Sequence, residues 1–183
     1  MNKLIVYFSY TNHTKEIANR IKEKINCDIL EIKTVIPYSE DYNKVVDDEQ
    51  NSEASNHLPK IQAINVDLSK YDEIILGTPV WWYRPAPAIR TFLSQNDLSG
   101  KTIKPFATNA GWIGRTFIEI KKLCPNSKVE DGLNILYDAG DYERVQTGRR
   151  KAAERNSCHD QIQTGDALPV LRPYGQCASG IVL

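Results

Sequence analysis

The stretch LIVYFSYTNHT, residues 4–14, decides the fold. It opens with five apolar residues in a row, which is typical of a strand buried on both faces of a parallel sheet. The run ends at once in side chains that form hydrogen bonds, and an amphipathic helix pattern follows over residues 14–25. The stretch therefore predicts a buried strand, a polar loop and a helix in direct succession.

The polar loop contains Ser9, Thr11, Asn12, His13 and Thr14 and is a candidate phosphate site. A helix N-terminus presents free backbone N–H groups to an anion, and the hydroxyls add further donors. The loop has no Lys or Arg, which suits a phosphate that is held rather than transferred. The alternative is that the hydroxyls only cap the helix, since Ser, Thr and Asn are common there. His13 is interpreted as a polar loop residue rather than a catalytic base.

The rest of residues 1–136 alternates between strand and helix patterns. We expect strands at 28–33, 73–77, 103–107 and 133–136, and helices at 86–94 and 113–123. Residues 34–66 read as a long polar excursion with a short helix near 41–49. The acidic side chains Asp47, Asp48 and Glu49 there are expected to form a solvated face. Strands that alternate with helices predict an α/β fold with a doubly wound parallel sheet.

Residues 137–183 differ from the preceding domain and are treated as an atypical C-terminal tail. They contain a basic run at 149–151 and few aliphatic residues. A last helix is expected here, yet the pattern for it is poor. The tail is either a degenerate helix with an extension or sequence foreign to the domain.

All three tryptophans fall in two of the loops that follow predicted strands. The loop at 78–87 reads TPVWWYRPAP and the loop at 108–114 reads TNAGWIG. In open α/β sheets, ligands bind at the carboxyl ends of the strands. Indoles gathered there predict a slot for a flat heterocycle, and a neighbouring phosphate loop makes that ligand a phosphorylated aromatic. We expect one of the three indoles to pack in the core, and Arg84 to be a solvated surface side chain.

Composition excludes several function classes. The net charge is zero, from 23 basic and 23 acidic side chains, so nucleic-acid binding has no support. Apolar runs of about five residues are too short for a membrane span or a signal peptide. The four cysteines show no zinc or redox spacing, and we expect reduced thiols in a cytoplasmic protein. The three histidines are far apart, so no metal site is predicted. Neither G-x-G-x-x-G nor G-K-[ST] occurs, which argues against a dinucleotide Rossmann site and a P-loop.

Over about residues 1–136 the chain resembles the flavodoxin family, in particular its bacterial flavodoxin-like branch. The family's phosphate loop runs Thr/Ser-x-Thr-Gly-Asn-Thr, and this chain matches it at Ser9, Thr11 and Thr14. It departs at Asn12 and His13, and Asn tolerates the positive φ that Gly adopts. The segment at 77–93 resembles the branch's Pro-x-Trp-Trp loop, and YSEDYNKVVDDE at 38–49 resembles its insertion after the second strand.

The resemblance implies a five-stranded parallel sheet of order 2-1-3-4-5 in three α/β/α layers, with FMN bound non-covalently. The implied FMN-binding residues are Ser9, Thr11, Asn12, His13, Thr14, Thr78, Pro79, Val80, Trp81, Trp82, Tyr83, Thr108, Asn109, Ala110, Gly111 and Trp112. The implied chemistry belongs to the flavin, and no catalytic side chain is assigned.

Three functions stay open. The first is an electron carrier that docks on a redox partner protein. The second is an FMN-dependent NAD(P)H quinone or nitro reductase acting on a small electron acceptor. The third is a non-redox interaction protein whose site has decayed. Basic and acidic side chains are equal in number in residues 1–136. This balance favours an oxidoreductase modestly, because carriers are typically strongly acidic.

Overall fold

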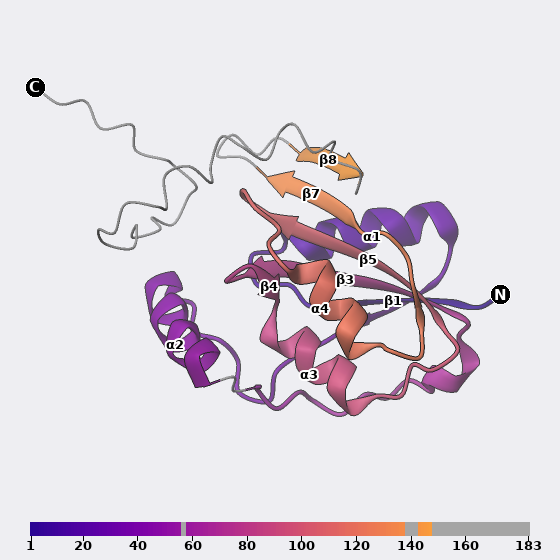
Figure 1. The fold of residues 1–183 in the computed structure, drawn as a ribbon, viewed down its shortest axis with the longest axis horizontal. Coiled ribbons are helices and arrows are strands. Elements are labelled where there is room, and N and C mark those ends of the chain that lie inside the picture. Colours follow the sequence, from indigo (N-terminus) through magenta and orange to yellow (C-terminus); the bar gives the residue numbers. More distant parts are fainter. Residues whose placement is uncertain (56–57, 138–142, 148–183) are drawn as a thin grey trace, which may run out of the picture.

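The computed structural model describes residues 1–55, 58–137 and 143–147. Five strands of this part form a parallel sheet in the order β2-β1-β3-β5-β7 (Figure 1). They are β1 (Lys3–Tyr7), β2 (Asp28–Glu31), β3 (Glu73–Trp81), β5 (Thr102–Asn109) and β7 (Leu133–Tyr137). The predicted doubly wound sheet of order 2-1-3-4-5 is therefore confirmed.

The expectation of a purely parallel, five-stranded sheet needs a correction. The described residues contain three further strands, and two of these are antiparallel to their neighbours. They are β4 (Arg84–Pro85) against β3, β6 (Lys128–Val129) parallel to β5, and β8 (Glu143–Thr147) against β7. Only five residues separate β7 from β8, too few for the crossover that a parallel neighbour needs.

Helices cover both faces of the sheet. α1 (His13–Ile25) lies on one face, and α3 (Pro87–Gln95) and α4 (Thr116–Leu123) lie on the other (Figure 1). Successive strand residues point to opposite faces, so β1 sends Leu4 and Val6 into the α3–α4 core and Ile5 into the α1 core. The three-layer α/β/α architecture is confirmed.

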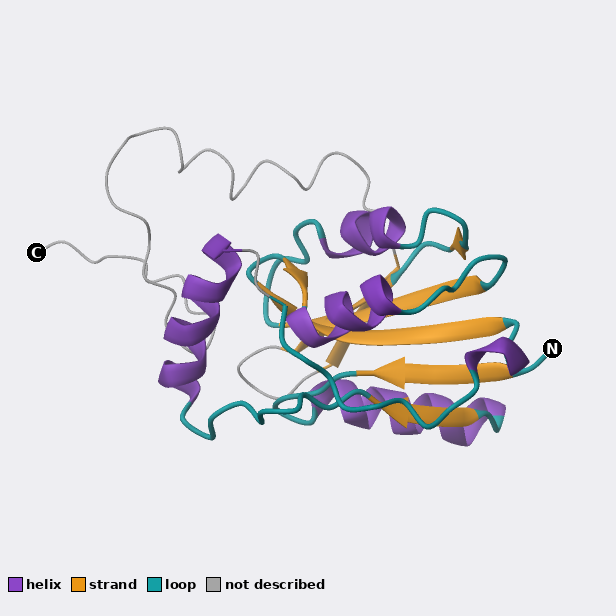
Figure 2. Cartoon of the chain, turned by 90° about the horizontal axis from the view of Figure 1, so that it is seen from below, coloured by secondary structure: helices purple, strands orange, loops and turns teal. Residues whose placement is uncertain are grey.

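The excursion over residues 34–66 carries α2 (Tyr42–Ser55), which is longer than the predicted helix. α2 lies beyond the end of the sheet at which β3 and β5 terminate (Figures 1 and 2). A short 3-10 helix, η1 (Leu68–Lys70), leads from the excursion into β3. Asp47 and Asp48 are exposed as expected, but Glu49 is buried, so the solvated acidic face was wrong at that position.

Most of the predicted C-terminal tail lies outside the described residues, which include neither 138–142 nor 148–183. Its assignment as a degenerate helix or foreign sequence, and the boundary at residue 136, stay predictions. Within the tail, residues 143–147 form strand β8 rather than part of a helix. In the described parts of the chain, no helix is both long and apolar enough to cross a bilayer, and no cluster of metal-ligating side chains occurs.

Candidate functional site

Three loops come together at the carboxyl end of the parallel strands, and each contacts the other two. The ring of Tyr10, after β1, lies edge-on to that of Trp81 at the end of β3, with centroids 5.9 Å apart. Tyr83 and Trp112 join the second loop to the third, at a centroid distance of 4.9 Å. Thr14 and Thr108 join the third loop to the first. The structure thus brings the predicted site segments into one place.

The loop before α1 leaves backbone donors available. Asn12 has a φ of 68°, the left-handed conformation that the family pattern fills with Gly, and its side chain makes no capping hydrogen bond. Its carbonyl accepts the N–H of Glu16 at 2.9 Å. Within the described residues, the N–H groups of Asn12, His13 and Thr14 donate to no protein acceptor. These three donors at a helix N-terminus can hold an anion.

The loop hydroxyls divide into two kinds. Ser9 Oγ accepts the N–H of Lys15 at 3.3 Å, so Ser9 performs part of the capping role that was the alternative reading. Thr11 is exposed, and its Oγ1 lies 3.3 Å from Nδ1 of His13. Thr11 is therefore the hydroxyl of this loop best placed to meet a ligand from solvent.

His13 has a packing role that the sequence did not predict. Its ring stacks on that of Tyr137 at the end of β7, with centroids 4.2 Å apart and planes inclined by 12°. This contact ties the first residue of α1 to the sheet strand beyond β5. The His13 ring is thereby held against the sheet, and its interpretation as a polar loop residue rather than a catalytic base stays a prediction.

The second predicted loop is largely a hairpin. Thr78, Pro79, Val80 and Trp81 belong to β3, and Trp82 and Tyr83 form the two-residue turn that leads into β4. Both turn residues have positive φ values, 46° and 64°. This geometry normally selects Asn and Gly, and a larger residue in the left-handed region costs about 1–2 kcal/mol. Strain of this kind persists only where the surroundings enforce it.

Contacts from two directions enforce the turn. At its base, the buried Thr78 Oγ1 accepts the N–H of Ala86 at 3.0 Å and donates to the carbonyl of Pro79 at 2.9 Å. At its tip, the N–H of Arg115 donates to the carbonyl of Tyr83 at 2.7 Å. Gly114 permits this approach, because a Cβ there would lie 2.2 Å from Cβ of Tyr83. The Thr78 hydroxyl therefore stabilises the hairpin, and its predicted role in ligand binding stays a prediction.

The three tryptophans occupy different environments. Trp81 packs edge-on against Phe8, Tyr10 and Tyr38, so it is the core indole that the sequence led us to expect. Trp82 is half-buried. Trp112 is 62% exposed and tilts by 51° against Tyr83, which is also exposed. Tyr83 and Trp112 are thus the aromatic surfaces available to a flat ligand.

The third loop is shaped by an amide side chain. Asn109 ends β5, and its Oδ1 accepts the N–H of Gly111 at 3.0 Å. Its Nδ2 donates to Oδ1 of Asn134 on β7. The turn leaves Ala110, Gly111 and Trp112 exposed at the surface. Asn109 therefore shapes the loop, and the residues after it are open to a ligand.

A buried ion cluster beneath the hairpin was not predicted. Both carboxylate oxygens of Glu119 accept from Arg84, through Nε and Nη2 at 2.6 Å each, and Nε of Arg90 lies 3.0 Å from Oε1. Arg84 is 18% exposed, so the solvated arginine expected there is corrected. The sequence signal was weak, because the three residues lie on β4, α3 and α4 and meet only after folding.

The electrostatics of this cluster follow from its packing. Burial raises the pKa of Glu119, but the hydrogen bond and the charge of Arg84, followed by the charges of Arg90 and Arg115, outweigh burial and leave it lowered. Burial and then the charge of Arg84 lower the pKa of Arg90. Glu49 of α2 acts on Arg90 in the opposite direction, which places a second buried carboxylate near the cluster.

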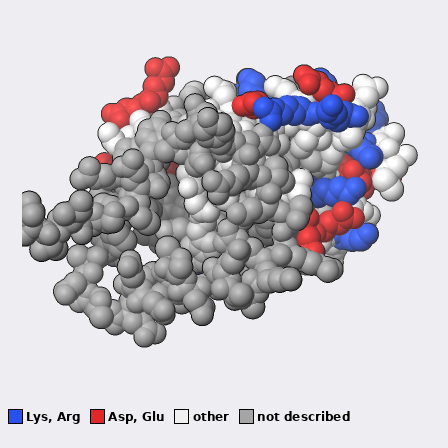
Figure 3. Space-filling view, turned by 90° about the horizontal axis from the view of Figure 1, so that it is seen from above, with Lys and Arg blue, Asp and Glu red and all other residues white. Residues whose placement is uncertain are grey.

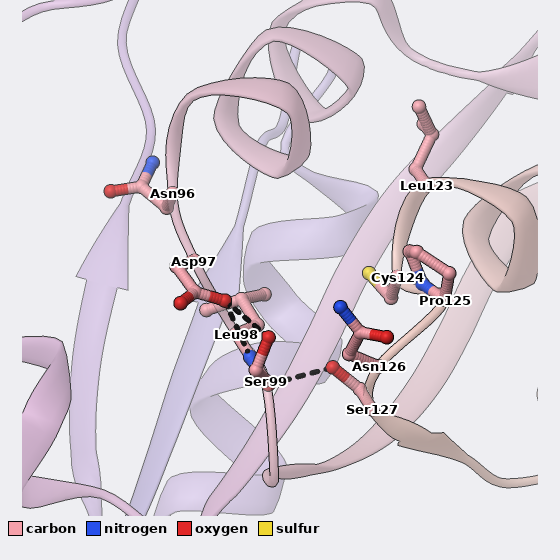
Figure 4. A pocket seen from close by; sticks show the side chains of 9 residues that line it. All are labelled: Asn96, Asp97, Leu98, Ser99, Leu123, Cys124, Pro125, Asn126 and Ser127. Atoms are coloured by element: carbon pink, nitrogen blue, oxygen red, sulfur yellow. Dashed lines mark hydrogen bonds between the residues drawn. The ribbon is translucent and has the colours of Figure 1, made fainter.

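A small pocket lies at the other end of the sheet and does not belong to this site. Its lining comes from the segment after α3 and from the end of α4 with the segment that follows (Figure 4). The Ser127 hydroxyl donates to the carbonyl of Leu98 at 2.6 Å, and the Ser99 hydroxyl donates to Asp97. With these hydroxyls engaged, the pocket shows no set of convergent polar groups for a ligand.

Comparison with known proteins agrees with this geometry. A family model described as Flavodoxin matches residues 2–146. The chain belongs to the flavodoxin family. Its three converging loops lie where open α/β sheets place their ligands, at the switch point in strand order. No curated protein sequence matches this flavodoxin.

Solved structures similar to this flavodoxin include a flavoprotein from Lactobacillus acidophilus NCFM in complex with FMN. It shares 28% identity, with 73% of this chain and 91% of that chain covered and a TM-score of 0.65. The apo form of the flavoprotein from the same bacterium gives 25% identity, the same two coverages and a TM-score of 0.59. A protein from Bacteroides eggerthii DSM 20697 gives 29% identity, coverages of 73% and 87%, and a TM-score of 0.66.

Proposed function

We propose that this flavodoxin binds FMN non-covalently and transfers electrons through it. The observation that carries the proposal is the free N–H groups of Asn12, His13 and Thr14 in the same cluster of loops as the exposed Tyr83–Trp112 pair. The first group suits a phosphate and the second suits a ring. The similar Lactobacillus acidophilus flavoprotein, which has been crystallised with FMN, supports the choice of ligand.

The residues present fit this cofactor. The three N–H groups and the Thr11 hydroxyl would hold the phosphate without a Lys or Arg in the loop. Trp112, Tyr83 and the half-buried Trp82 would cover the ring and exclude water from it. Bound FMN supplies one- and two-electron redox chemistry, and the protein tunes it through polarity and hydrogen bonds. No side chain of the site is assigned a proton-transfer role.

The kind of electron donor and acceptor distinguishes two forms of this function. We favour an oxidoreductase that takes electrons from NAD(P)H and gives them to a small acceptor over a carrier for a redox partner protein. Acidic and basic side chains are mixed on the described part of the face in Figure 3. Carriers that use a strong acidic field for steering differ from this pattern. We propose the cytoplasm as its location, with Cys27 and Cys124 as free thiols.

The test uses the purified full chain. FMN is added to the apoprotein and binding is followed by flavin fluorescence; NADPH or NADH is then added under anaerobic conditions without any partner protein. Rapid loss of the flavin absorbance supports the reductase, and retained FMN with no direct reaction supports the carrier. Failure to retain FMN contradicts both and favours the non-redox interaction protein.

A further inference from the structure

The strained hairpin and the start of α4 are joined at two points. The first is the backbone hydrogen bond from Arg115 to Tyr83. The second is the two-pronged pair between Arg84, which follows the turn, and Glu119, one helical turn beyond Arg115. Within α4, the N–H of Glu119 in turn donates to the carbonyl of Arg115 at 2.8 Å. Both interactions therefore connect the start of α4 to the same hairpin turn.

These joints set the geometry of the exposed aromatic pair. Tyr83 lies on the hairpin turn, and Trp112 lies on the segment that leads into α4. Their rings can keep a fixed distance and tilt only where hairpin and helix keep a fixed relation. A bidentate Arg–carboxylate pair constrains orientation as well as distance, unlike a single hydrogen bond.

We propose that Glu119 is a positioning residue of the flavin site, which holds the Trp82–Tyr83 turn in register with Trp112. The proposal rests on the proposed function, and it adds the residue that pre-organises the part of the flavin site that binds the ring. Glu119 itself lies beneath the turn, 16% exposed, and acts on the ligand through Arg84. Pre-organisation improves affinity because less ordering remains to be done when the ligand binds.

The cluster also reaches the excursion. Arg90 of α3 contacts Glu119, and the buried Glu49 of α2 acts on Arg90 electrostatically. Charges of alternating sign thus extend from α2 through α3 and α4 to the hairpin. The four side chains that carry them are at least four-fifths buried: Glu49, Arg90, Glu119 and Arg84.

The chain offers a matched control at the opposite end of β3. Glu73 is another buried carboxylate with two cationic partners, Lys3 at 3.6 Å and Lys104 at 2.7 Å. It is at the start of β3, whereas the hairpin is at the end of that strand. Glu73→Gln therefore removes a comparable buried charge without touching the hairpin.

The experiment compares Glu119→Gln and Arg84→Lys with Glu73→Gln in the full chain, at a temperature where each is folded. Arg84→Lys keeps the positive charge but loses the bidentate geometry of the guanidinium, so it remains informative if Glu119→Gln does not fold. We expect both site variants to bind FMN and riboflavin about tenfold more weakly, by the same factor for each, which corresponds to about 1.4 kcal/mol. The loss of affinity is the same for FMN and riboflavin because the substitutions affect binding of the ring, which both flavins share, and not binding of the phosphate.

A second readout does not need the flavin. Near-ultraviolet circular dichroism of the apoprotein includes a contribution from the Tyr83–Trp112 pair, and the spectrum should change in Glu119→Gln and Arg84→Lys but not in Glu73→Gln. Unchanged flavin affinities and an unchanged spectrum in folded site variants would overturn the proposal, as would equal effects of Glu73→Gln. A wild-type chain that binds no FMN would refute the proposed function, while the apoprotein spectra still test the positioning role.

Discussion

The hydroxyls of Thr14 and Thr108 lie 2.7 Å apart, and both side chains are buried. Thr14 is the second residue of α1 and Thr108 is near the end of β5, so one hydrogen bond ties α1 to the sheet across 94 residues of sequence. Each hydroxyl brings one hydrogen, and the pair uses one of them. The two predicted ligand residues therefore also act as an anchor for the site.

The anchor predicts a non-additive pair of substitutions. Thr14→Val or Thr108→Val alone leaves a buried hydroxyl without its partner and should lower the free energy of unfolding by about 1–3 kcal/mol. The double variant removes both hydroxyls, so its loss should be smaller than the sum. Urea unfolding of the four proteins measures this, and simple additivity would show that the two hydroxyls are not coupled.

Thr11→Ala distinguishes phosphate binding from helix capping. The Thr11 hydroxyl is exposed and makes no contact with the helix backbone N–H groups in the described residues, so stability should change little. Loss of a hydrogen bond to a charged phosphate should weaken FMN binding by about 1.5–3 kcal/mol and leave riboflavin binding unchanged. Parallel titrations with the two flavins decide the question, and equal losses would support capping.

Trp112→Ala and Trp81→Ala should fail in different ways. Trp112 is exposed, so its loss should weaken FMN binding by about 1–3 kcal/mol with almost no effect on unfolding. Trp81 contacts three aromatic rings, and its truncation should cost about 3 kcal/mol of stability, at the lower end for large aromatics because it is only partly buried. Flavin titration and thermal unfolding of both variants test the distinction. If both variants bind FMN as tightly as the wild type, neither Trp112 nor Trp81 stacks on the flavin.

The ion cluster predicts an acid-sensitive contribution to stability. The pKa of Glu119 is lowered in the folded protein from its ordinary value of 4.5. Its carboxylate therefore stabilises the fold above that value, and the contribution is lost as the pH falls through the lowered pKa. The difference in unfolding free energy between the wild type and Glu119→Gln should thus be largest near neutral pH and shrink below about pH 4.5. A difference that stays constant down to pH 3 would contradict this.

The last strand predicts a boundary for truncation. β8 pairs with β7 along five positions, from Leu133 with Thr147 to Tyr137 with Glu143. A chain that ends after Tyr137 exposes that edge of β7 and should self-associate. A chain that ends after Thr147 keeps the edge paired and includes all residues that the family model matches, so it should stay monomeric where the shorter chain does not. Size-exclusion chromatography with light scattering compares the two.

Local pattern was sufficient for the five parallel strands and for the end of the sheet at which the candidate site lies. The continuous apolar run at residues 4–8 predicted a strand buried on both faces, because such a strand does not alternate between apolar and polar residues. The polar residues of the first loop and the clustered tryptophans indicated the ligand end, because parallel strands place their carboxyl ends at one edge of a sheet. The antiparallel β8 was missed because the expected helix came from the topology and not from the residues of that segment.

Residues 4–14, the alternation of strand and helix patterns, and the positions of the three tryptophans thus predicted, by sequence alone, an α/β sheet with a candidate site for a flat phosphorylated ligand at one end. Only the tertiary structure decided which groups are free to meet that ligand. The Thr78 hydroxyl forms hydrogen bonds within its hairpin, and Trp81 packs against three aromatic rings. Arg84 pairs with Glu119, whereas Trp112 stays exposed. The reason is physical: periodicity reports which face of an element is buried, but partners that meet across separate elements exist only once the chain has folded.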